Sequence, residues 1–298
     1  MDRNSFLYKV RRKCQQIAFY ILPHDLLSKI YCKIVIHKNI DLKNPKTLNE
    51  KLQWYKLNYC PKNNLIVQCA DKFQVRSYIE EKGYKNVLTN LIGYWENVED
   101  IDWNNLPDKF VLKCTHGCAY NILCKDKSTF NIKEAKKKLK KWLKEDFSVF
   151  NVELHYGKIR PRRIICEEYL GDVIIDYKFF CFNGEPKFYY VSSDLVHDRD
   201  AEMGFFNLDG FKIPLIREDY KDIGEIKQPD CFLEMLDITK KLSKDFPFVR
   251  VDFFLVEDGF KFAELTFTPG AAMMPINPEK FDVEWGKLLN FSEIMEVK

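Results

Sequence analysis

The feature that most constrains this chain is the segment of residues 249–270, which reads VRVDFFLVEDGFKFAELTFTPG. Two runs rich in Phe and Val flank the turn-forming residues 257–259, a pattern typical of an antiparallel β-hairpin. Because side chains alternate along a strand, Arg250 and Asp252 share one face of the first strand. One face of the second strand carries Glu264, Thr266 and Thr268.

The length of the turn decides which side chains oppose one another. A three-residue loop centred on Asp258 predicts that Phe254 lies opposite Phe262. The same register places Asp252 opposite Glu264, with Cβ atoms about 5 Å apart. Two carboxylates that close repel each other unless a cation lies between them or one is protonated. Hard oxygen ligands at this spacing suit Mg²⁺, which prefers a few carboxylates together with substrate phosphates.

Two other arrangements of the hairpin stay open. A two-residue turn at 258–259 would place Asp252 opposite Leu265, so the magnesium hypothesis depends on the longer loop. A fully solvated hairpin would leave both carboxylates in water, but its neighbours, such as residues 253–255, are too apolar for an exposed sheet.

Three further segments have residue types that suit a phosphate ligand. Lys113 ends one apolar strand and Lys178 lies inside another; each either meets an anion or extends its ammonium group to water. Residues 115–119 form a loop of mostly small side chains, which lets backbone N–H groups approach phosphate oxygens. Residues 166–171 end a buried strand and either offer backbone groups to an adenine edge or are an ordinary strand end.

The order of expected elements predicts an α+β protein, with helices first and then mixed strands and helices in antiparallel sheets. Thr47 followed by Glu50 is a capping box that starts a helix. Helices are expected at 5–21, 26–36, 47–57, 71–82, 131–145 and 229–246. Strands are expected at 86–94, 109–113, 121–124, 163–169, 173–182, 186–192, 248–256 and 260–267.

Positive charge is concentrated at the start of the chain. Residues 1–40 carry a net charge of +6, whereas the whole chain carries +3, so the remainder is mildly acidic. This distribution argues against a nucleic-acid partner. The expected helix at 5–21 is basic and amphipathic: it either contacts an anionic membrane surface or packs on the protein with its basic face in water.

The ten cysteines are scattered and form no CxxC pair. With no cleavable signal peptide expected, reduced thiols in the cytoplasm are the better interpretation, peripheral to the inner face of the membrane if the basic helix binds there. A zinc site is a further alternative, although the spacing of its four residues fits no common zinc motif. These residues are Cys114, His116, Cys118 and Cys124.

In their order along the chain, six stretches resemble the TupA-like ATP-grasp family, which is found in bacterial cell-surface polysaccharide loci. The stretches are NPKTLNEKLQWYKL (44–57), ADKFQVRSYI (70–79), KFVLKCTHG (109–117), CEEYLGD (166–172), DYKFFCFNGEP (176–186) and VRVDFF…FAELTFTPG (249–270). The resemblance implies an ATP-grasp fold, in which two lobes with antiparallel sheets grip ATP. It implies a helical N-terminal region at 1–85, a small lobe at 86–168 and a large lobe with the metal site at 169–298.

The resemblance also implies the nucleotide-binding residues. Lys113 would meet the α- and β-phosphates of ATP. The phosphates would be covered by His116, Gly117, Cys118 and Ala119. The adenine and ribose would be lined by Glu167, Glu168, Tyr169 and Leu170.

The remaining implied roles belong to the reaction centre. Lys178 would reach the γ-phosphate or the substrate, and Arg250 would steady the transferred phosphoryl group or the acyl phosphate. Mg²⁺ would be held by Asp252, Glu264 and Thr266, where Thr266 stands at a position that is Asn in many ATP-grasp enzymes.

The implied activity is that of an ATP-dependent carboxylate–amine ligase, which forms an amide through an acyl phosphate. The enzyme would modify a uronic-acid sugar or attach an amino compound to a surface polysaccharide, in capsule or other surface polysaccharide biosynthesis. Alternatives are an ATP-grasp sugar kinase, a membrane-surface or partner-binding adaptor, and a glycosyltransferase that uses the D-x-D triplet of Asp198, Arg199 and Asp200. His155 and His197 are candidates for a general base, without a supporting motif.

Overall fold

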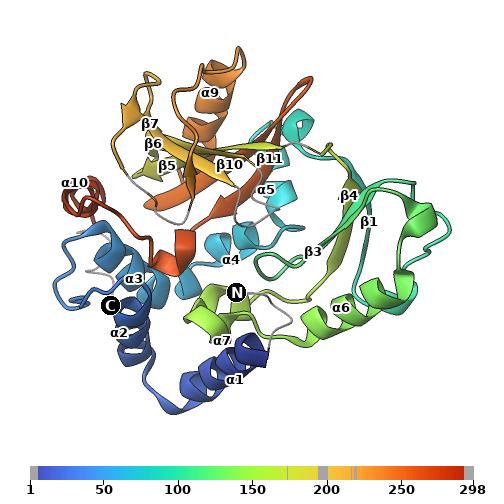
Figure 1. Cartoon of the computed structure of the whole chain (residues 1–298), viewed down its shortest axis with the longest axis horizontal. Coiled ribbons are helices and arrows are strands. Elements are labelled where there is room, and N and C mark those ends of the chain that lie inside the picture. Colours follow the sequence, from blue (N-terminus) through green and yellow to red (C-terminus); the bar gives the residue numbers. More distant parts are fainter. Residues whose placement is uncertain (1–5, 173, 194–200, 216, 218–219, 292–298) are drawn as a thin grey trace. The chain divides into compact units, whose positions relative to one another are not determined.

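The computed structural model describes residues 6–172, 174–193, 201–215, 217 and 220–291 (Figure 1). The described residues form two compact units. The first contains 6–67, 146–158 and 267–291, and the second contains 68–145 and 159–266. The division at residues 85 and 168 stays a prediction, which limited proteolysis would test.

The first unit is helical. Its α-helices are α1 (Phe6–Ile21), α2 (His24–Val35), α3 (Leu48–Asn58), α7 (Ser148–Asn151), α8 (Leu154–Gly157) and α10 (Lys280–Leu288), with 3₁₀ turns at Cys60–Lys62 and Pro269–Ala272. α4 (Asn64–Ala70) spans the residues where the first unit ends and the second begins. The predicted capping box of α3 is confirmed, since the hydroxyl of Thr47 accepts from the amide of Glu50 and the Glu50 carboxylate accepts from the amide of Thr47.

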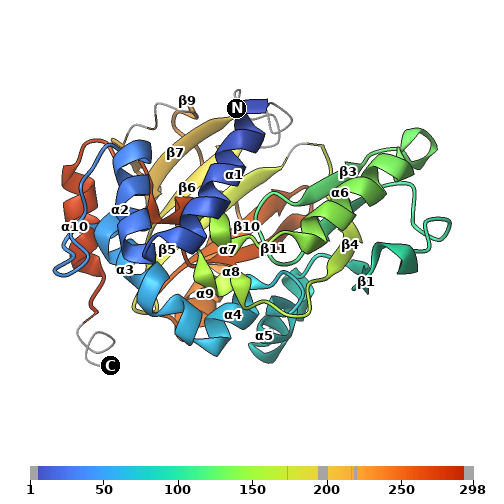
Figure 2. The same cartoon turned by 90° about the horizontal axis from the view of Figure 1, so that it is seen from below.

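The second unit contains two sheets (Figures 1 and 2). The smaller sheet has the order β1-β4-β2-β3 and is antiparallel throughout. Its strands are β1 (Leu91–Trp95), β2 (Phe110–Cys114), β3 (Asn121–Cys124) and β4 (Ile164–Glu168). α6 (Ile132–Lys144) packs against β2, and α5 (Val75–Glu81) lies earlier in the chain. Short 3₁₀ turns occur at Lys85–Val87, Val98–Asp100 and Lys127–Thr129.

The larger sheet has the order β11-β10-β5-β6-β7-β8, with β9 paired in parallel to β7 and the other pairs antiparallel. Its strands are β5 (Ile175–Phe182), β6 (Glu185–Ser193), β7 (Glu202–Asn207), β8 (Lys212–Ile213), β9 (Lys221–Asp222), β10 (Phe248–Val256) and β11 (Gly259–Thr266). α9 (Phe232–Ser243) packs across β5, β6 and β10. Buried rings join the two layers, with Phe232 of α9 centred 5.6 Å from Phe179 and 5.0 Å from Tyr189.

The predicted α+β class with antiparallel sheets and a helical N-terminal region is confirmed, and several expected elements are shorter than predicted. The strand expected at 86–94 begins only at Leu91, because Lys85–Val87 forms a 3₁₀ turn. The helix expected at 71–82 begins at Val75, because the carboxylate of Asp71 accepts from the amides of Phe73 and Gln74 and holds them in a turn. Strands β7 to β9 and helices α4, α7, α8 and α10 were not predicted. Within the described ranges, no helix has the length and apolar character needed to span a membrane.

Candidate active site

The turn of the β10–β11 hairpin has two residues, Glu257 and Asp258, instead of three. As a result Phe254 lies opposite Lys261, and its predicted pairing with Phe262 is wrong. This turn also differs from the alternative two-residue turn at 258–259, so neither expected turn geometry is the observed one.

The predicted pairing of Asp252 with Glu264 is nevertheless confirmed. The register shifts between Asp252 and Phe253, where Phe253 pairs with Phe262 and Asp252 pairs with Glu264. A bulge of this kind inserts one extra residue into one strand, here on β11. The bulge therefore compensates for the short turn and brings the two carboxylates opposite each other.

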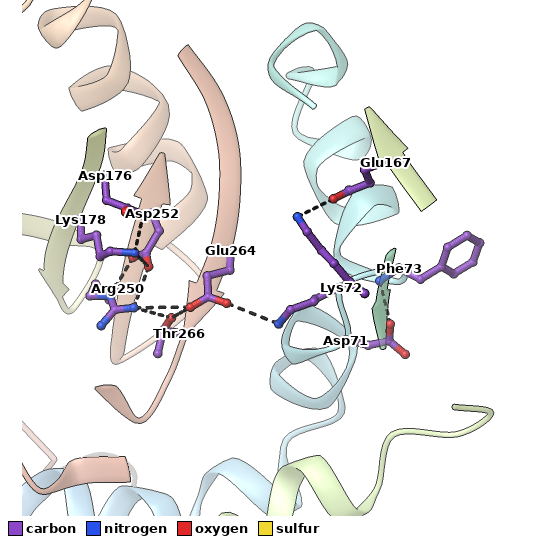
Figure 3. A network of polar contacts seen from close by, with 11 residues as sticks. Asp71, Lys72, Phe73, Glu167, Asp176, Lys178, Arg250, Asp252, Glu264 and Thr266 are labelled. Atoms are coloured by element: carbon purple, nitrogen blue, oxygen red, sulfur yellow. Dashed lines mark hydrogen bonds and ion pairs between the residues drawn. The ribbon is translucent and has the colours of Figure 1, made fainter. Parts of the chain in front are cut away.

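Asp252 belongs to a buried group of four charges (Figure 3). The Arg250 guanidinium donates to both carboxylate oxygens of Asp252, at 2.7 and 2.6 Å. Lys178 of β5 lies opposite Asp252, and its Nζ is 3.1 Å from Asp252 and 2.7 Å from Asp176. Burial alone would lower the pKa of Lys178, but the carboxylates of Asp252 and Asp176 raise it. Burial raises the pKa of Asp176 despite the nearby lysine.

Glu264 extends this charge chain toward helix α5. Its Oε1 accepts from the hydroxyl of Thr266 at 2.8 Å and lies 3.4 Å from Arg250. Its Oε2 lies 3.4 Å from Nζ of Lys72 (Figure 3). Burial would raise the pKa of Glu264, but the positive charges of Lys72, Arg250 and Lys178 lower it to about 2. Glu264 is therefore held as a carboxylate at neutral pH.

A second ion-pair group lies beside it. Nζ of Lys113 on β2 is 2.6 Å from Oε2 of Glu167 on β4, and Nη1 of Arg76 is 3.2 Å from Oε1 of the same carboxylate. Together with Lys72, these residues line a cavity of about 20 Å³, whose other walls come from Val75, Leu88, Phe262 and Ala263. A cavity of this volume has room for about one water molecule. The structure thus brings the predicted Lys113 and Glu167 into direct contact.

The predicted phosphate-covering loop joins β2 to β3. The amide of Lys72 donates to the carbonyl of Thr115 at the start of this loop. The His116 ring is buried, with Nε2 3.0 Å from the carbonyl oxygen of Trp142, so this side chain packs against α6. Burial, with a contribution from nearby Arg162, lowers the pKa of His116 to about 4. Gly117 is buried, whereas Cys118 and Ala119 are exposed at the loop tip.

The predicted hinge residues follow the end of β4. The Glu168 carboxylate accepts from the amide of Asn90 at 2.8 Å, and the Tyr169 hydroxyl donates to Asp172. Tyr169 and Leu170 are partly exposed. The roles of these residues in nucleotide binding stay predictions.

Mg²⁺ fits the donor set on the hairpin. Mg²⁺ is usually held by one or two carboxylates and by substrate phosphates, so two opposed carboxylates are enough. Asp252 and Glu264 supply them, and the hydroxyl of Thr266 lies at the rim of the pair. In this structure, Arg250, Lys178 and Lys72 balance their charge.

Three residues of the site were not predicted from the sequence. Lys72 and Arg76 lie in the ADKFQVR stretch, to which no role was assigned because it lies outside the predicted strands. Asp176 could have been found, since it precedes Lys178 by two positions and therefore shares its face of β5. Its contact with Lys178 shows that this lysine is paired inside the protein and does not extend to water.

Other predicted candidates lie elsewhere. Across the described part of the chain, no three His, Cys, Asp or Glu side chains gather as metal ligands, so the zinc interpretation of residues 114–124 is wrong. All ten cysteines are free. His155 is buried in the first unit, where burial and the charge of Lys56 lower its pKa to about 3. The D-x-D triplet 198–200 and His197 lie outside the described residues.

The two antiparallel sheets, the strand lysines and the opposed carboxylates place this chain in the ATP-grasp class. More specifically, the chain belongs to the TupA-like ATP-grasp family, whose sequence model matches residues 50–290. The resemblance of the six sequence stretches to this family is thereby confirmed.

Solved structures of similar chains are also found. D-alanine–D-alanine ligase from Helicobacter pylori has 17% identity and a TM-score of 0.46, with 82% of this chain and 68% of that chain covered. L-amino acid ligase from Bacillus licheniformis has 13% identity and a TM-score of 0.42, with coverages of 70% and 45%. D-alanine–D-alanine ligase from Bacillus anthracis has 18% identity and a TM-score of 0.43, with coverages of 74% and 65%. A search of curated proteins gave no match.

Proposed function

We propose that this protein is an ATP-dependent carboxylate–amine ligase. The protein acts in the cytoplasm, where it either modifies a uronic-acid sugar or attaches an amino compound to a capsule or another bacterial surface polysaccharide. The proposal rests on membership of the TupA-like ATP-grasp family and on the sequence resemblance to proteins of polysaccharide loci. The observation that carries it is the pair Asp252 and Glu264, opposed on one hairpin and surrounded by three cations.

The proposed reaction has two steps. A carboxylate oxygen of the acid attacks the γ-phosphorus of ATP, the bond to the β-phosphate oxygen breaks, and ADP leaves. The amine nitrogen then attacks the acyl carbon, the C–O bond to phosphate breaks, phosphate leaves with the electron pair, and the nitrogen loses a proton. Positioning and charge neutralisation dominate phosphoryl transfer, so no protein nucleophile is required.

The residues of the charge chain have distinct proposed tasks. Asp252 and Glu264, with Thr266, would hold Mg²⁺, which when bound neutralises charge on the phosphates. Lys178 would contact the γ-phosphate or the substrate, and Arg250 would stabilise the transferred phosphoryl group. Both cations already lie within 3.1 Å of the Asp252 carboxylate, so they would take these roles by exchanging a carboxylate partner for a phosphate.

Nucleotide binding requires the second ion-pair group to rearrange. The cavity lined by Lys113 and Glu167 holds about one water and is too small for a nucleotide. We assign Lys113 to the α- and β-phosphates, the 116–119 loop to the phosphate chain, and residues 167–170 to the adenine and ribose. Exchange of the Glu167 carboxylate for a phosphate at Lys113 replaces one anion with another, which limits the cost of opening.

Lys72 is an additional proposed phosphate-binding residue. It lines the cavity and contacts Glu264, so it lies between the proposed nucleotide and metal sites of the same unit. Burial alone would lower the pKa of Lys72, but the Glu264 carboxylate raises it, which keeps the ammonium charged. The backbone amide of Lys72 also donates a hydrogen bond to the carbonyl of Thr115, which links Lys72 to the phosphate-covering loop.

Two assays test the proposed function. Mg·ATP should raise the melting temperature of the protein, and Glu264→Gln should abolish this shift. Lys72→Met should raise the KM for ATP about tenfold or more, with partial recovery in Lys72→Arg. ADP release across a panel of uronic acids and amines should then require both an acid and an amine.

The controls use residues from the same region. Glu257→Gln alters an exposed carboxylate in the turn of the same hairpin and should leave the ATP shift intact, as should Lys85→Met on the surface. ADP release that needs a sugar but no amine would identify a kinase. Stabilisation by a UDP-sugar and not by ATP would favour the glycosyltransferase and overturn the ligase.

A further inference from the structure

Helix α1 turns its apolar face toward solvent. A helix on the surface of a globular protein normally buries its apolar stripe against the core. Here six apolar side chains of α1 are exposed over 42–78% of their surface. They are Phe6, Leu7, Val10, Ile17, Tyr20 and Ile21.

The opposite, more polar side of α1 attaches the helix to the first unit. Gln15 is buried and its Nε2 donates to the carbonyl of Phe150 in α7 at 2.6 Å. The Arg12 guanidinium lies 3.2 Å from the centre of the Phe150 ring. Phe19 stacks on His24 at the start of α2, with ring centroids 4.4 Å apart. These contacts fix the rotation of the helix and therefore keep its apolar face outward.

This observation corrects one of the two interpretations of residues 5–21. A helix that packs on the protein with a solvated basic face would bury Ile17 and Val10, but both are exposed. The outward face is instead mostly apolar, with exposed basic residues within it and at its edge.

The charges beside the apolar face fit an anionic surface. With about 3.6 residues per turn, Arg11 lies at one edge of the apolar stripe and Lys13 lies within it, between Phe6 and Tyr20; both are exposed. In the adjacent α2, Lys33 is exposed next to Ile34, which is 64% exposed. Residues 1–40 hold eight lysines and arginines against two aspartates. Lysine and arginine flanking an apolar helix face are typical of helices that lie in the headgroup region of a membrane.

We propose that α1 lies flat on an anionic lipid membrane, with its apolar face in the lipid and Arg11 and Lys13 at the headgroups. The helix has 16 residues and is about 24 Å long, which favours lying on the surface over spanning. A large exposed apolar patch is uncommon on a soluble domain unless it binds something. The local positive charge favours anionic lipid over a second copy of the same basic helix, which it would repel. The proposal does not depend on the identity of the catalysed reaction.

Vesicle flotation of the full chain tests this proposal. The wild-type protein should float with vesicles of phosphatidylcholine and phosphatidylglycerol at low salt, and much less with phosphatidylcholine alone. Phe6→Asp with Ile17→Asp should reduce binding about tenfold or more, and so should Arg11→Glu with Lys13→Glu. Leu233→Asp is the matched control, because Leu233 is 76% exposed on α9 of the other unit, and it should bind like wild type.

The same variants separate the alternatives. Circular dichroism and the Mg·ATP melting shift should be unchanged in all of them, because the altered residues are exposed. Flotation that persists in both double variants would overturn the proposal. The proposal would also be overturned if the wild type fails to float and light scattering shows that Phe6→Asp with Ile17→Asp converts a dimer into a monomer. In that case a second copy of the protein, and not lipid, would cover the apolar face of α1.

Discussion

Replacing Lys178 with Met should strongly destabilise the second unit, apart from any effect on catalysis. The side chains of Asp176 and Lys178 are each 9% exposed and that of Asp252 is fully buried, so water cannot replace a lost partner. With Arg250, these residues form two positive and two negative charges that cancel. Methionine matches the stem of lysine but removes the charge, which leaves one buried negative charge without compensation.

The expected magnitude follows from this imbalance. Removing one partner of a buried ion pair lowers the free energy of unfolding by about 3–5 kcal/mol. The uncompensated carboxylate is Asp176, which keeps no other ion pair within 4 Å among the described residues, whereas Asp252 keeps Arg250. Asp176→Asn in the Lys178→Met background removes that charge and should recover at least about 1 kcal/mol.

Urea unfolding followed by circular dichroism at pH 7.5 measures these values. Without Lys178, the folded-state pKa of Asp176 rises further above its unfolded value, so the variant gains stability relative to wild type as the pH falls. Lys187→Met, an exposed lysine on β6 of the same sheet, should change stability by less than about 0.5 kcal/mol. A loss below about 1 kcal/mol for Lys178→Met, or a double variant no more stable than the single one, would refute the argument.

Three other predictions concern stability. The pKa of Glu264 is lowered to about 2 from its ordinary 4.5, so the stability that this carboxylate contributes is present above pH 4.5 and lost as the pH falls toward 2. Urea unfolding at several pH values should show that Glu264→Gln lacks this acid-sensitive part of the stability and that Lys72→Met has less of it. Gly286→Ala places a Cβ against the backbone oxygen of Lys46 and should reduce the free energy of unfolding by about 1–3 kcal/mol. An unchanged melting temperature would contradict this, because it would mean that α10 can shift away without cost. Burial lowers the pKa of Lys56 to about 8 from 10.5, so the free energy of unfolding of the wild type should increase as the pH rises from 8 to 10.5. Urea titrations in this alkaline range should show that Lys56→Met lacks the increase.

The sequence by itself determined the local elements and the chemical nature of the site. Alternation placed Arg250 and Asp252 on one face, and β10 has the predicted bounds Phe248–Val256. The capping box at Thr47 and the strand at 121–124 were also predictable, because each depends on residues close in the chain. The six stretches were enough to predict the family.

The tertiary structure decided the contacts between distant residues. Lys72 contacts Glu264, which is 192 residues away in the sequence, and Arg76 contacts Glu167, which is 91 residues away. A local sequence pattern cannot predict contacts over such separations. The bulge that brings Asp252 opposite Glu264 arises from the register of a whole hairpin and not from its turn alone. The sequence likewise did not determine the orientation of α1. Periodicity defines an apolar face, but the direction of that face follows from the hydrogen bond of Gln15 and the cation–π contact of Arg12, both with Phe150. Local geometry follows from neighbouring residues, whereas charge pairing and face orientation depend on which elements pack together.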